Sequence, residues 1–264
     1  MKISVITVCY NAVEVIRTAI ASVASQRADA EIEYIVVDGG STDGTAREIE
    51  RFAEELEKGG GRKNFRLRWI SEKDDGMYDA LNKGMKMATG DVIGILNADD
   101  VFASDDVLAQ IAAAFEDPTL DGTYADIRFV KEGPDDIRTA ATVRYCSGKR
   151  FRPWMFRFGT QTAHPSTFFR KSCFAKWGAY SLDYGMYGDF ELLCRFIWKN
   201  RARMKYLPIC TTVMRMGGAS TDGWRTTLKI NRCDLRALKA NGCWSCMPFL
   251  YSRYLLKIWG FVFR

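Results

Sequence analysis

Apolar positions along the first hundred residues fall into two alternating patterns. Continuous apolar runs, typical of strands buried on both faces, occupy residues 3–8, 34–37, 67–70 and 92–96. Between these runs, apolar residues recur every three or four positions, which indicates helices with one buried face. An order of strand, helix, strand, helix requires right-handed crossovers. The pattern therefore predicts an α/β fold with a Rossmann-like, open, mostly parallel sheet flanked by helices.

Four helices are expected in this region. Asn11 reads as the N-cap of the first, and Ser41 or Thr42 as the cap of the second, over about residues 43–57. The fourth should follow a cap at Ser104. The apolar faces of the first, third and fourth helices are expected to comprise Val13, Ile16, Ile20 and Val23; Met77, Leu81, Met85 and Ala88; and Val107, Leu108, Ile111 and Phe115.

Beyond residue 120 the pattern is less regular. Strands are expected at residues 123–130 and 162–169, a helix at 189–198, and irregular structure with short strands over 131–160. A change in charge balance near residues 217–223 marks the one boundary that the sequence suggests. The chain is therefore divided into a folded body, residues 1–220, and a tail, residues 221–264.

The positive charge of the chain is concentrated in that tail. The 264 residues carry 38 Lys and Arg against 32 Asp and Glu, a formal net charge of +6. Eight basic and two acidic residues lie in the tail, which accounts for the whole net charge. A nucleic-acid-binding domain should carry its positive charge on the folded body, so no nucleic-acid partner is expected.

The remaining composition is that of a globular protein. A hydrophobic content of 47% and a charged content of 27% argue against disorder, collagen and coiled coil. Eight scattered cysteines, without a signal peptide, favour reduced thiols in the cytosol. Cys243 and Cys246 form a lone CxxC, which supplies too few ligands for zinc. No apolar run is long enough to predict a membrane-spanning helix.

The tail itself has two helical patterns. Its first half places five basic residues on one stripe: Arg225, Lys229, Arg232, Arg236 and Lys239. Residues 249–263 are mostly apolar, with charges on one narrow face at Arg253, Lys257 and Arg264. A basic amphipathic helical tail of this kind suits the interface of an anionic membrane. The alternative is that the first helix is solvated and the second packs on the folded body.

Acidic residues follow three consecutive predicted strands. Asp38 ends the second strand, Asp74 and Asp75 follow the third, and Asp99 and Asp100 follow the fourth. In an open α/β sheet these carboxyl ends lie at one edge, where ligands bind. Clustered carboxylates repel one another unless a cation compensates them, and hard oxygen ligands favour Mg²⁺ or Mn²⁺. A single such Asp would more simply cap a helix or turn, but three strand ends together favour a binding site.

The strings around these acids are more specific. Residues 37–45 read VDGGSTDGT, residues 71–84 read SEKDDGMYDALNKG, and residues 88–100 read ATGDVIGILNADD. In these motifs and their order, the chain resembles the inverting family 2 glycosyltransferases of GT-A fold, above all the bacterial enzymes that assemble exopolysaccharide or O-antigen repeat units. The resemblance covers residues 1–220. It implies a nucleotide-sugar-binding half over residues 1–100 and an acceptor half over residues 101–220.

The resemblance also implies roles for individual residues. Asp38 matches the acid that contacts the nucleotide base, and Asp74 matches a second acid near the nucleotide. Asn97 replaces the first Asp of the family's DxD motif, which leaves Asp99 as the best metal ligand and Asp100 as the next. The implied nucleotide-sugar-binding residues are Thr7, Tyr10, Asn11, Asp38, Asp74, Lys83, Asn97 and Asp99, with Mn²⁺ or Mg²⁺ as cofactor.

Inverting transfer also needs a base to take the proton of the attacking hydroxyl. Asp189, in the string YGDFELLCR, matches the Asp of the family's E-D motif, and Glu191 is the second choice. The simpler alternative is that Asp189 only caps a helix. His164, in HPST, resembles a possible acceptor or diphosphate contact, although a single His is more often structural. Ser220, in GGAST at residues 217–221, resembles part of a loop over the site.

These resemblances predict a metal-dependent enzyme that moves one sugar, a hexosyl or N-acetylhexosaminyl group, from a nucleotide-diphosphate sugar such as a UDP-sugar. The QxxRW element of processive synthases is missing, which favours single transfer. The expected acceptor is a polyprenyl-diphosphate-linked saccharide, so the enzyme would be cytoplasmic and peripheral on the inner face of the cell membrane. Two alternatives remain: a nucleotidyltransferase, although residues 8–14 lack its basic Gly-rich loop, and a non-catalytic nucleotide-sugar-binding scaffold.

Overall fold

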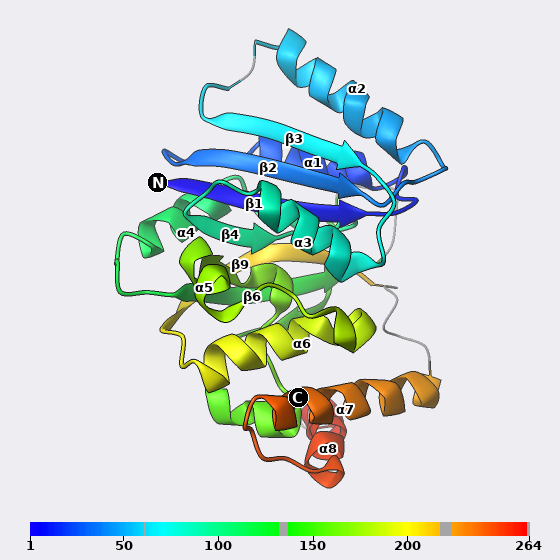
Figure 1. Ribbon diagram of the computed structural model, residues 1–264, viewed down its shortest axis with the longest axis vertical. Helices are drawn as coiled ribbons and strands as arrows, with labels where there is room; N and C mark the ends of the chain where they lie inside the picture. The colour runs from blue at the N-terminus through cyan, green and yellow to red at the C-terminus, as the bar shows by residue number, and fades with distance from the viewer. Residues whose placement is uncertain (61, 132–136, 217–222, 263–264) are drawn as a thin grey trace.

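Four parallel strands form one half of the central sheet, as the apolar pattern predicts (Figure 1). The computed structural model describes residues 1–60, 62–131, 137–216 and 223–262, and the side chains of 223–225 and 255–262 lie outside this description. The parallel strands lie in the order β3 (Phe65–Ser71), β2 (Glu31–Asp38), β1 (Lys2–Cys9) and β4 (Val92–Ile95). The crossover helices are α1 (Ile16–Ala24), α2 (Thr45–Lys58) and α3 (Met77–Met87).

The other half of the sheet is mixed. β8 (Phe168–Arg170) runs antiparallel to both β4 and β6 (Gly122–Val130), and β9 (Met204–Arg215) lies parallel to β6. β5 (Val101–Phe102) pairs with β9, and β7 (Thr142–Cys146) pairs with β6. The strand expected over 162–169 is wrong, because His164–Ser166 forms a 3-10 turn and only β8 is extended. β9 was not predicted, because Lys205, Pro208 and the two threonines at 211–212 interrupt any continuous apolar run.

Apolar side chains on the two faces of the sheet form two cores. Ile3, Val5 and Tyr34 face the core covered by α1, α2 and α4 (Val107–Ala114), whereas Ile6 and Ile35 face the core covered by α3 and α6 (Gly188–Leu193). Burial on both faces explains why these strands have continuous apolar sequences. The helix predicted over 189–198 is present as α6 and a π-helical continuation, Cys194–Lys199. In α3, Met77 is exposed and the next residue, Tyr78, is buried in its place.

The expected N-caps are wrong, because their side chains connect loops instead. α1 begins after Val15 and α2 after Gly44, and neither has a side-chain cap hydrogen bond. Asn11, at φ 49°, accepts a hydrogen bond from the Thr42 N–H through Oδ1 (3.0 Å). The Ser41 hydroxyl donates to the Asp38 carboxylate instead.

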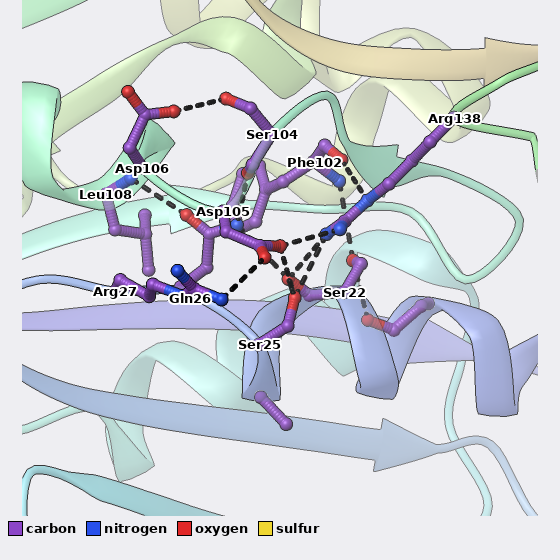
Figure 2. A network of polar contacts seen from close by, with 12 residues as sticks. Ser22, Ser25, Gln26, Arg27, Phe102, Ser104, Asp105, Asp106, Leu108 and Arg138 are labelled. Atoms are coloured by element: carbon purple, nitrogen blue, oxygen red, sulfur yellow. Dashed lines mark hydrogen bonds and ion pairs between the residues drawn. The ribbon is translucent and has the colours of Figure 1, made fainter.

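A polar network replaces the expected cap of α4 (Figure 2). Ser104 donates to Asp106 rather than to the helix, and Gln26 from the end of α1 accepts the Leu108 N–H (3.0 Å). Arg138 bonds Asp105 (2.7 Å) and the Phe102 carbonyl (2.9 Å) in the same network. This network therefore fastens α1 to the start of α4 and to the segment after β6.

The two C-terminal helices, α7 (Gly223–Ala240) and α8 (Met247–Val262), pack below α6 in Figure 1. They contact η1 (Pro153–Phe158) and η3 (Leu182–Tyr187), two 3-10 segments of the acceptor half. The prediction that Arg253 lies on a charged outer face of α8 is wrong, because its side chain is only 12% exposed and lies at the interface with α7. Of the alternative interpretation of the tail, the packing of the second helix on the folded body is present over the residues whose side chains are described. The first helix is not merely solvated, because Ala237 and Leu238 of α7 are buried.

Other expectations for this region concern residues that lie partly outside the described part of the chain. In α7, Lys229, Arg232, Arg236 and Lys239 are exposed as predicted, whereas the side chain of Arg225 is not described. The boundary near 217–223 and the GGAST loop with Ser220 fall on or beside residues 217–222, which lie outside the described residues. Within the described residues, no helix is long and apolar enough to cross a membrane.

We expect Gly94→Ala to lower the free energy of unfolding by about 1–3 kcal/mol, because a Cβ at Gly94 in β4 would overlap the ring of the buried Phe168 in β8. Urea denaturation of the single variants and of the double variant with Phe168→Ala would measure this cost. In the Phe168→Ala background the added methyl should cost little. An equal cost in both backgrounds would contradict the assigned overlap.

Candidate functional site

The register of the parallel strands brings three strand ends to one edge of the sheet. Cys9 of β1 pairs with Asp38 of β2, which in turn pairs with Ser71 of β3. The Leu96 N–H donates to the Ile6 carbonyl (3.0 Å), so residues 97–100 emerge beside the end of β1. The expectation that the acids following these strands share one edge is therefore confirmed.

Asp38 is a fully buried carboxylate held by short side chains. Ser71 donates to Oδ2 through its hydroxyl (2.6 Å), and the Ser41 N–H donates to the same oxygen (3.1 Å). The Ser41 hydroxyl donates to Oδ1. These donors compensate the buried negative charge and fix its orientation at this edge of the sheet.

The loops after β1 and β2 are joined by several further hydrogen bonds. The Ala12 N–H donates to Thr45 Oγ1 (2.8 Å), and the Val13 N–H donates to Asp43 Oδ2 (3.1 Å). Thr7 was expected to contact the nucleotide, but its side chain is fully buried, with its hydroxyl bonded to the Leu96 carbonyl and to the Tyr34 hydroxyl. Thr7 therefore supports the strand beneath the site.

Tyr10 and Asp74 converge above Gly39. A Cβ at Gly39 would overlap the Asp74 carboxylate and contact the Tyr10 ring, so only glycine allows this approach. Tyr10 is 64% exposed, which leaves its ring available to a ligand. Asp74 Oδ1 accepts the Gly76 N–H (2.9 Å) at the start of α3. The expected pair of nucleotide-binding residues thus lies on one surface.

Lys83 stabilises the loop that carries Asp74. Its ammonium donates to the Lys73 carbonyl (2.8 Å) and forms ion pairs with Glu72 (3.0 Å) and Asp79 (3.4 Å). These partners raise the pKa of Lys83, with the hydrogen bond to Glu72 the largest cause. In this conformation Lys83 orders the loop by binding its backbone and acids.

Asn97, Asp99 and Asp100 form the candidate metal centre. Asn97 Nδ2 donates to Asp100 Oδ2 (2.7 Å), while the buried Asp100 Oδ1 has no hydrogen-bond partner among the described residues. Burial and the charge of Asp99 raise the pKa of Asp100, with Arg215 opposing. No group of three His, Cys, Asp or Glu residues in the described part of the chain could hold a metal. An ion here would have to complete its coordination with ligand oxygens, which suits Mg²⁺ or Mn²⁺ bound with a diphosphate.

Asp189 lies at the start of α6, over the first turn of α3. Its backbone N–H donates to the Tyr78 hydroxyl (2.9 Å), and its Oδ1 lies 3.4 Å from the same hydroxyl. Gln161 Nε2 donates to Oδ2 (2.9 Å). Burial and the negative charge of Asp189 raise the pKa of Tyr78, so this hydroxyl stays protonated. Gln161 is therefore the main donor to the carboxylate, because the single Tyr78 hydroxyl proton is shared with the Met186 carbonyl (3.2 Å). The carboxylate has no cationic partner among the described residues.

His164 belongs to the layer that supports Asp189. Its Nε2 lies 2.6 Å from the Tyr180 hydroxyl, and the Tyr180 ring stacks on the Tyr78 ring at 5.3 Å. Asn82 of α3 fixes Tyr180 by bonds to both its backbone N–H (3.0 Å) and its carbonyl (2.9 Å). Burial lowers the pKa of His164, while the charge of Asp189 opposes this shift. His164 thus lies near Asp189, but the hydrogen bond described for its ring is to the Tyr180 hydroxyl.

Glu191 does not fit its expected role as a second base. It is buried and paired with Arg195, whose Nε lies 3.0 Å from Oε1. Asn241 Nδ2 from the end of α7 donates to the same oxygen (3.2 Å). Residues two positions apart in an α-helix lie on nearly opposite sides, so Glu191 points away from Asp189 and into the contact between α6 and α7. Its role there is to stabilise that contact.

Three members of this site were not predicted from the sequence: Tyr78, Gln161 and Tyr180. Tyr78 stands inside the string SEKDDGMYDALNKG, and Gln161 stands three residues before His164. A buried tyrosine on a helical face reads as ordinary core, so only the packing of α3 against α6 shows what its hydroxyl contacts.

The family model "Glycosyl transferase family 2" matches residues 4–178, about two thirds of the chain. The chain belongs to glycosyl transferase family 2. An uncharacterised glycosyltransferase of Mycobacterium tuberculosis (strain H37Rv) is 34% identical over 200 residues, which cover 73% of this chain and 68% of the relative. A PGL/p-HBAD biosynthesis glycosyltransferase of the same strain is 31% identical over 193 residues, with the same coverage.

Solved structures share the GT-A fold of this family 2 chain. Staphylococcus aureus TarS 1–349 in complex with UDP superimposes with a TM-score of 0.59 at 18% identity, over 90% of this chain and 65% of that one. The mannosyltransferase PcManGT from Pyrobaculum calidifontis, in complex with GDP-Man and Mn²⁺, gives 0.60 at 19% identity, over 98% and 79%. The chain spans only 40% of the longer TarS chain. At these identities the likeness shows the fold.

We expect His164 to titrate below its ordinary pKa of 6.5, because burial disfavours its charged form. As the pH falls below 6.5, the unfolded chain takes up a proton that the folded chain binds more weakly. The free energy of unfolding should therefore decrease, by up to about 1.4 kcal/mol per pH unit between the two pKa values.

His164 is the single histidine of the chain, so NMR titration of its ring gives this pKa directly. Urea denaturation at pH 8 and pH 5 should show a smaller pH effect in His164→Gln than in the unmodified protein. A ring pKa at or above 6.5 would contradict the assigned burial effect.

Proposed function

We propose that this family 2 protein transfers a single sugar, with inversion, from a nucleotide-diphosphate sugar to an acceptor hydroxyl. The donor proposed is a UDP-sugar carrying a hexosyl or N-acetylhexosaminyl group. The family assignment supports the transferase class, and the UDP complex of TarS is consistent with this choice of donor. Residues 1–100 would hold the nucleotide sugar and residues 101–220 the acceptor.

The position of α3 between the two sets of acids carries the proposal. Asp74 accepts the N–H of Gly76, the residue before α3, and Tyr78, in the first turn of the helix, contacts Asp189. The proposed nucleotide contacts and the proposed base therefore lie at the same end of one rigid helix. Rigid positioning of donor and base is the main contribution that a single-displacement reaction requires of the protein.

Asp189 is the base in this proposal. The acceptor hydroxyl attacks the anomeric carbon, the bond from that carbon to the diphosphate oxygen breaks, and the hydroxyl proton moves to Asp189. Tyr78 and Gln161 hold the carboxylate in one orientation throughout.

Asp99 is the proposed principal metal ligand, with Asp100 and Asn97 beside it. A bound Mn²⁺ or Mg²⁺ would neutralise charge on the leaving diphosphate. The buried, unpartnered Oδ1 of Asp100 fits such an ion, because a carboxylate oxygen without a donor is costly to bury.

We expect Asp189→Asn to lower transfer by about 10²- to 10⁴-fold, because it removes the proton acceptor while keeping the hydrogen-bonding shape. UDP binding and the melting temperature should stay unchanged. Asp99→Ala should lower both turnover and Mn²⁺-dependent UDP binding. Release of UDP from a panel of UDP-sugars, with and without acceptor, measures turnover.

Asp91→Asn is the matched control, because Asp91 bonds the Lys2 N–H (2.9 Å) near the opposite edge of the sheet and should leave turnover unchanged. Near-normal turnover of Asp189→Asn would refute the base assignment. UDP binding without any donor turnover in the unmodified protein would favour a non-catalytic nucleotide-sugar-binding scaffold.

The proposed acceptor is a polyprenyl-diphosphate-linked saccharide of cell-surface polysaccharide biosynthesis, met at the inner face of the membrane. The exposed basic residues of α7 support this part of the proposal. Lys229, Arg232 and Lys239 are exposed, whereas Asp234 of the same helix is buried. The outer face of α7 is thus positively charged and complementary to anionic lipid.

We expect the full chain to float with vesicles containing phosphatidylglycerol but not with neutral vesicles. Reversal of Lys229, Arg232 and Lys239 to Glu should abolish flotation, because each basic residue near the surface contributes about 1 kcal/mol. Reversal of Arg47, Lys58 and Lys63, exposed basic residues outside α7, is the charge-matched control. If both triple variants were recovered equally with the vesicles, α7 would not be the segment that contacts the membrane.

A further inference from the structure

Arg253 of α8 is the centre of a buried polar cluster between α7, α8 and the body. Its guanidinium pairs with Asp234 of α7 (2.9 Å), and the two side chains are only 12% and 3% exposed. The same group donates to Asn231 Oδ1 (2.5 Å) and to the carbonyl of Gly159 (2.5 Å). One planar, five-donor group therefore ties both C-terminal helices to the segment after η1.

Gly159 allows this approach through its backbone. It has φ 66°, in the left-handed region, and a Cβ at this position would overlap the Arg253 guanidinium. The Gly159 N–H donates to the Phe156 carbonyl (2.8 Å), and the Thr160 N–H donates to the Met155 carbonyl (3.2 Å). Because Arg253 donates to the Gly159 carbonyl, both backbone polar groups of Gly159 are held by hydrogen bonds.

Two residues after Gly159, Gln161 donates to Asp189 Oδ2 (2.9 Å). Arg253 is thus connected to Asp189 through a short, hydrogen-bonded backbone segment. Asp234 and Asp189 also interact electrostatically: burial raises the pKa of Asp234 to about 7, Arg253 opposes the shift, and the charge of Asp189 adds to it. The cluster therefore lies close enough to the base for the charges to interact.

Neighbouring contacts secure the same docking. The Ser245 hydroxyl donates to the Arg157 carbonyl (2.5 Å), and the Phe249 ring stacks on Phe158 at 4.9 Å. Arg157 and Phe158 both lie at the end of η1, directly before Gly159. Ser245, in the loop before α8, and Phe249 of α8 thus hold the end of η1, from which residues 159–161 continue to Gln161. The C-terminal segment also reaches α6 directly, through the hydrogen bond from Asn241 to Glu191.

We propose that Arg253 is a positioning residue for the transfer reaction: through Gly159 and Gln161 it sets the orientation of Asp189, so the C-terminal helices form part of the catalytic apparatus. The inference rests on the proposed role of Asp189 as base. It extends the functional unit beyond residues 1–220, because a body without α8 would lack the group that fixes Gly159.

The test compares Arg253→Met with Arg68→Met in the full chain. Arg68 is a matched control, because it also pairs with a buried acid, Glu33 (3.0 Å), and donates to a carbonyl, that of Met87 (2.7 Å). Kinetics use the UDP-sugar that the unmodified protein hydrolyses fastest among UDP-glucose, UDP-galactose and UDP-GlcNAc, with Mn²⁺. UDP binding and the melting temperature are measured alongside.

Both variants should have a lower melting temperature than the unmodified protein. Only Arg253→Met should lower kcat, by about 10- to 100-fold, with little change in KM for the donor. Hydrogen exchange at residues 159–161 should accelerate in Arg253→Met and not in Arg68→Met. Arg253→Lys keeps the charge but cannot reach all three acceptors, so it should recover stability more than kcat.

Three outcomes decide between the claims, with Asp189→Asn assayed in parallel. Unchanged kcat in Arg253→Met beside an inactive Asp189→Asn would overturn the positioning role alone. Equal loss of kcat in Arg253→Met and Arg68→Met would show a general structural effect and overturn it too. An active Asp189→Asn would instead overturn the base assignment. If Arg253→Met does not fold, Arg253→Lys and Asp234→Asn carry the same comparison.

Discussion

The contact between Tyr78 and Asp189 is the interaction on which the arrangement of the site depends. It joins α3, which belongs to the half of the sheet that follows the parallel pattern, to α6, which belongs to the mixed half. Gly188 allows the close approach, because a Cβ there would lie 3.0 Å from the Tyr78 ring. Tyr180 and His164 support Tyr78 from behind. Together with the bonds from Asn82 to Tyr180, this contact holds Asp189 beside the start of α3, next to the loop that carries Asp74.

Buried carboxylates elsewhere in the protein each have strong compensating partners. Glu33 is paired with Arg68 and bonded by Ser4, and its pKa falls to about 2 although burial opposes the shift. Glu191 has Arg195, and Asp234 has Arg253. Asp100 differs, since Asn97 and Arg215 only partly offset its burial and its Oδ1 has no hydrogen-bond partner in the described part of the chain. An acid kept at such a cost is consistent with the cation expected at this position.

The C-terminal helices combine two physically distinct surfaces. Their inner face is a structural interface with polar and aromatic contacts to η1 and α6, whereas the outer face of α7 carries the exposed basic residues. The net charge of the chain, which the sequence assigns to the tail, therefore divides: Arg253 stabilises the interior, and Lys229 and Arg232 remain available to an anionic surface. Packing on the body and contact with a membrane need not compete, since they use opposite faces.

The sequence by itself determined the parallel half of the fold and the acids at its edge, because continuous apolar strands buried on both faces leave one arrangement and place their carboxyl ends together. It also identified the family through the strings that carry those acids. The tertiary structure alone decided the rest. It placed Thr7 and Glu191 outside the expected site, because the Thr7 hydroxyl bonds the distant Leu96 carbonyl and the Glu191 carboxylate pairs with Arg195 and Asn241. It brought Tyr78, Gln161 and Arg253 to the neighbourhood of Asp189, since hydrogen bonds between residues up to 111 positions apart leave no periodic signal in the chain.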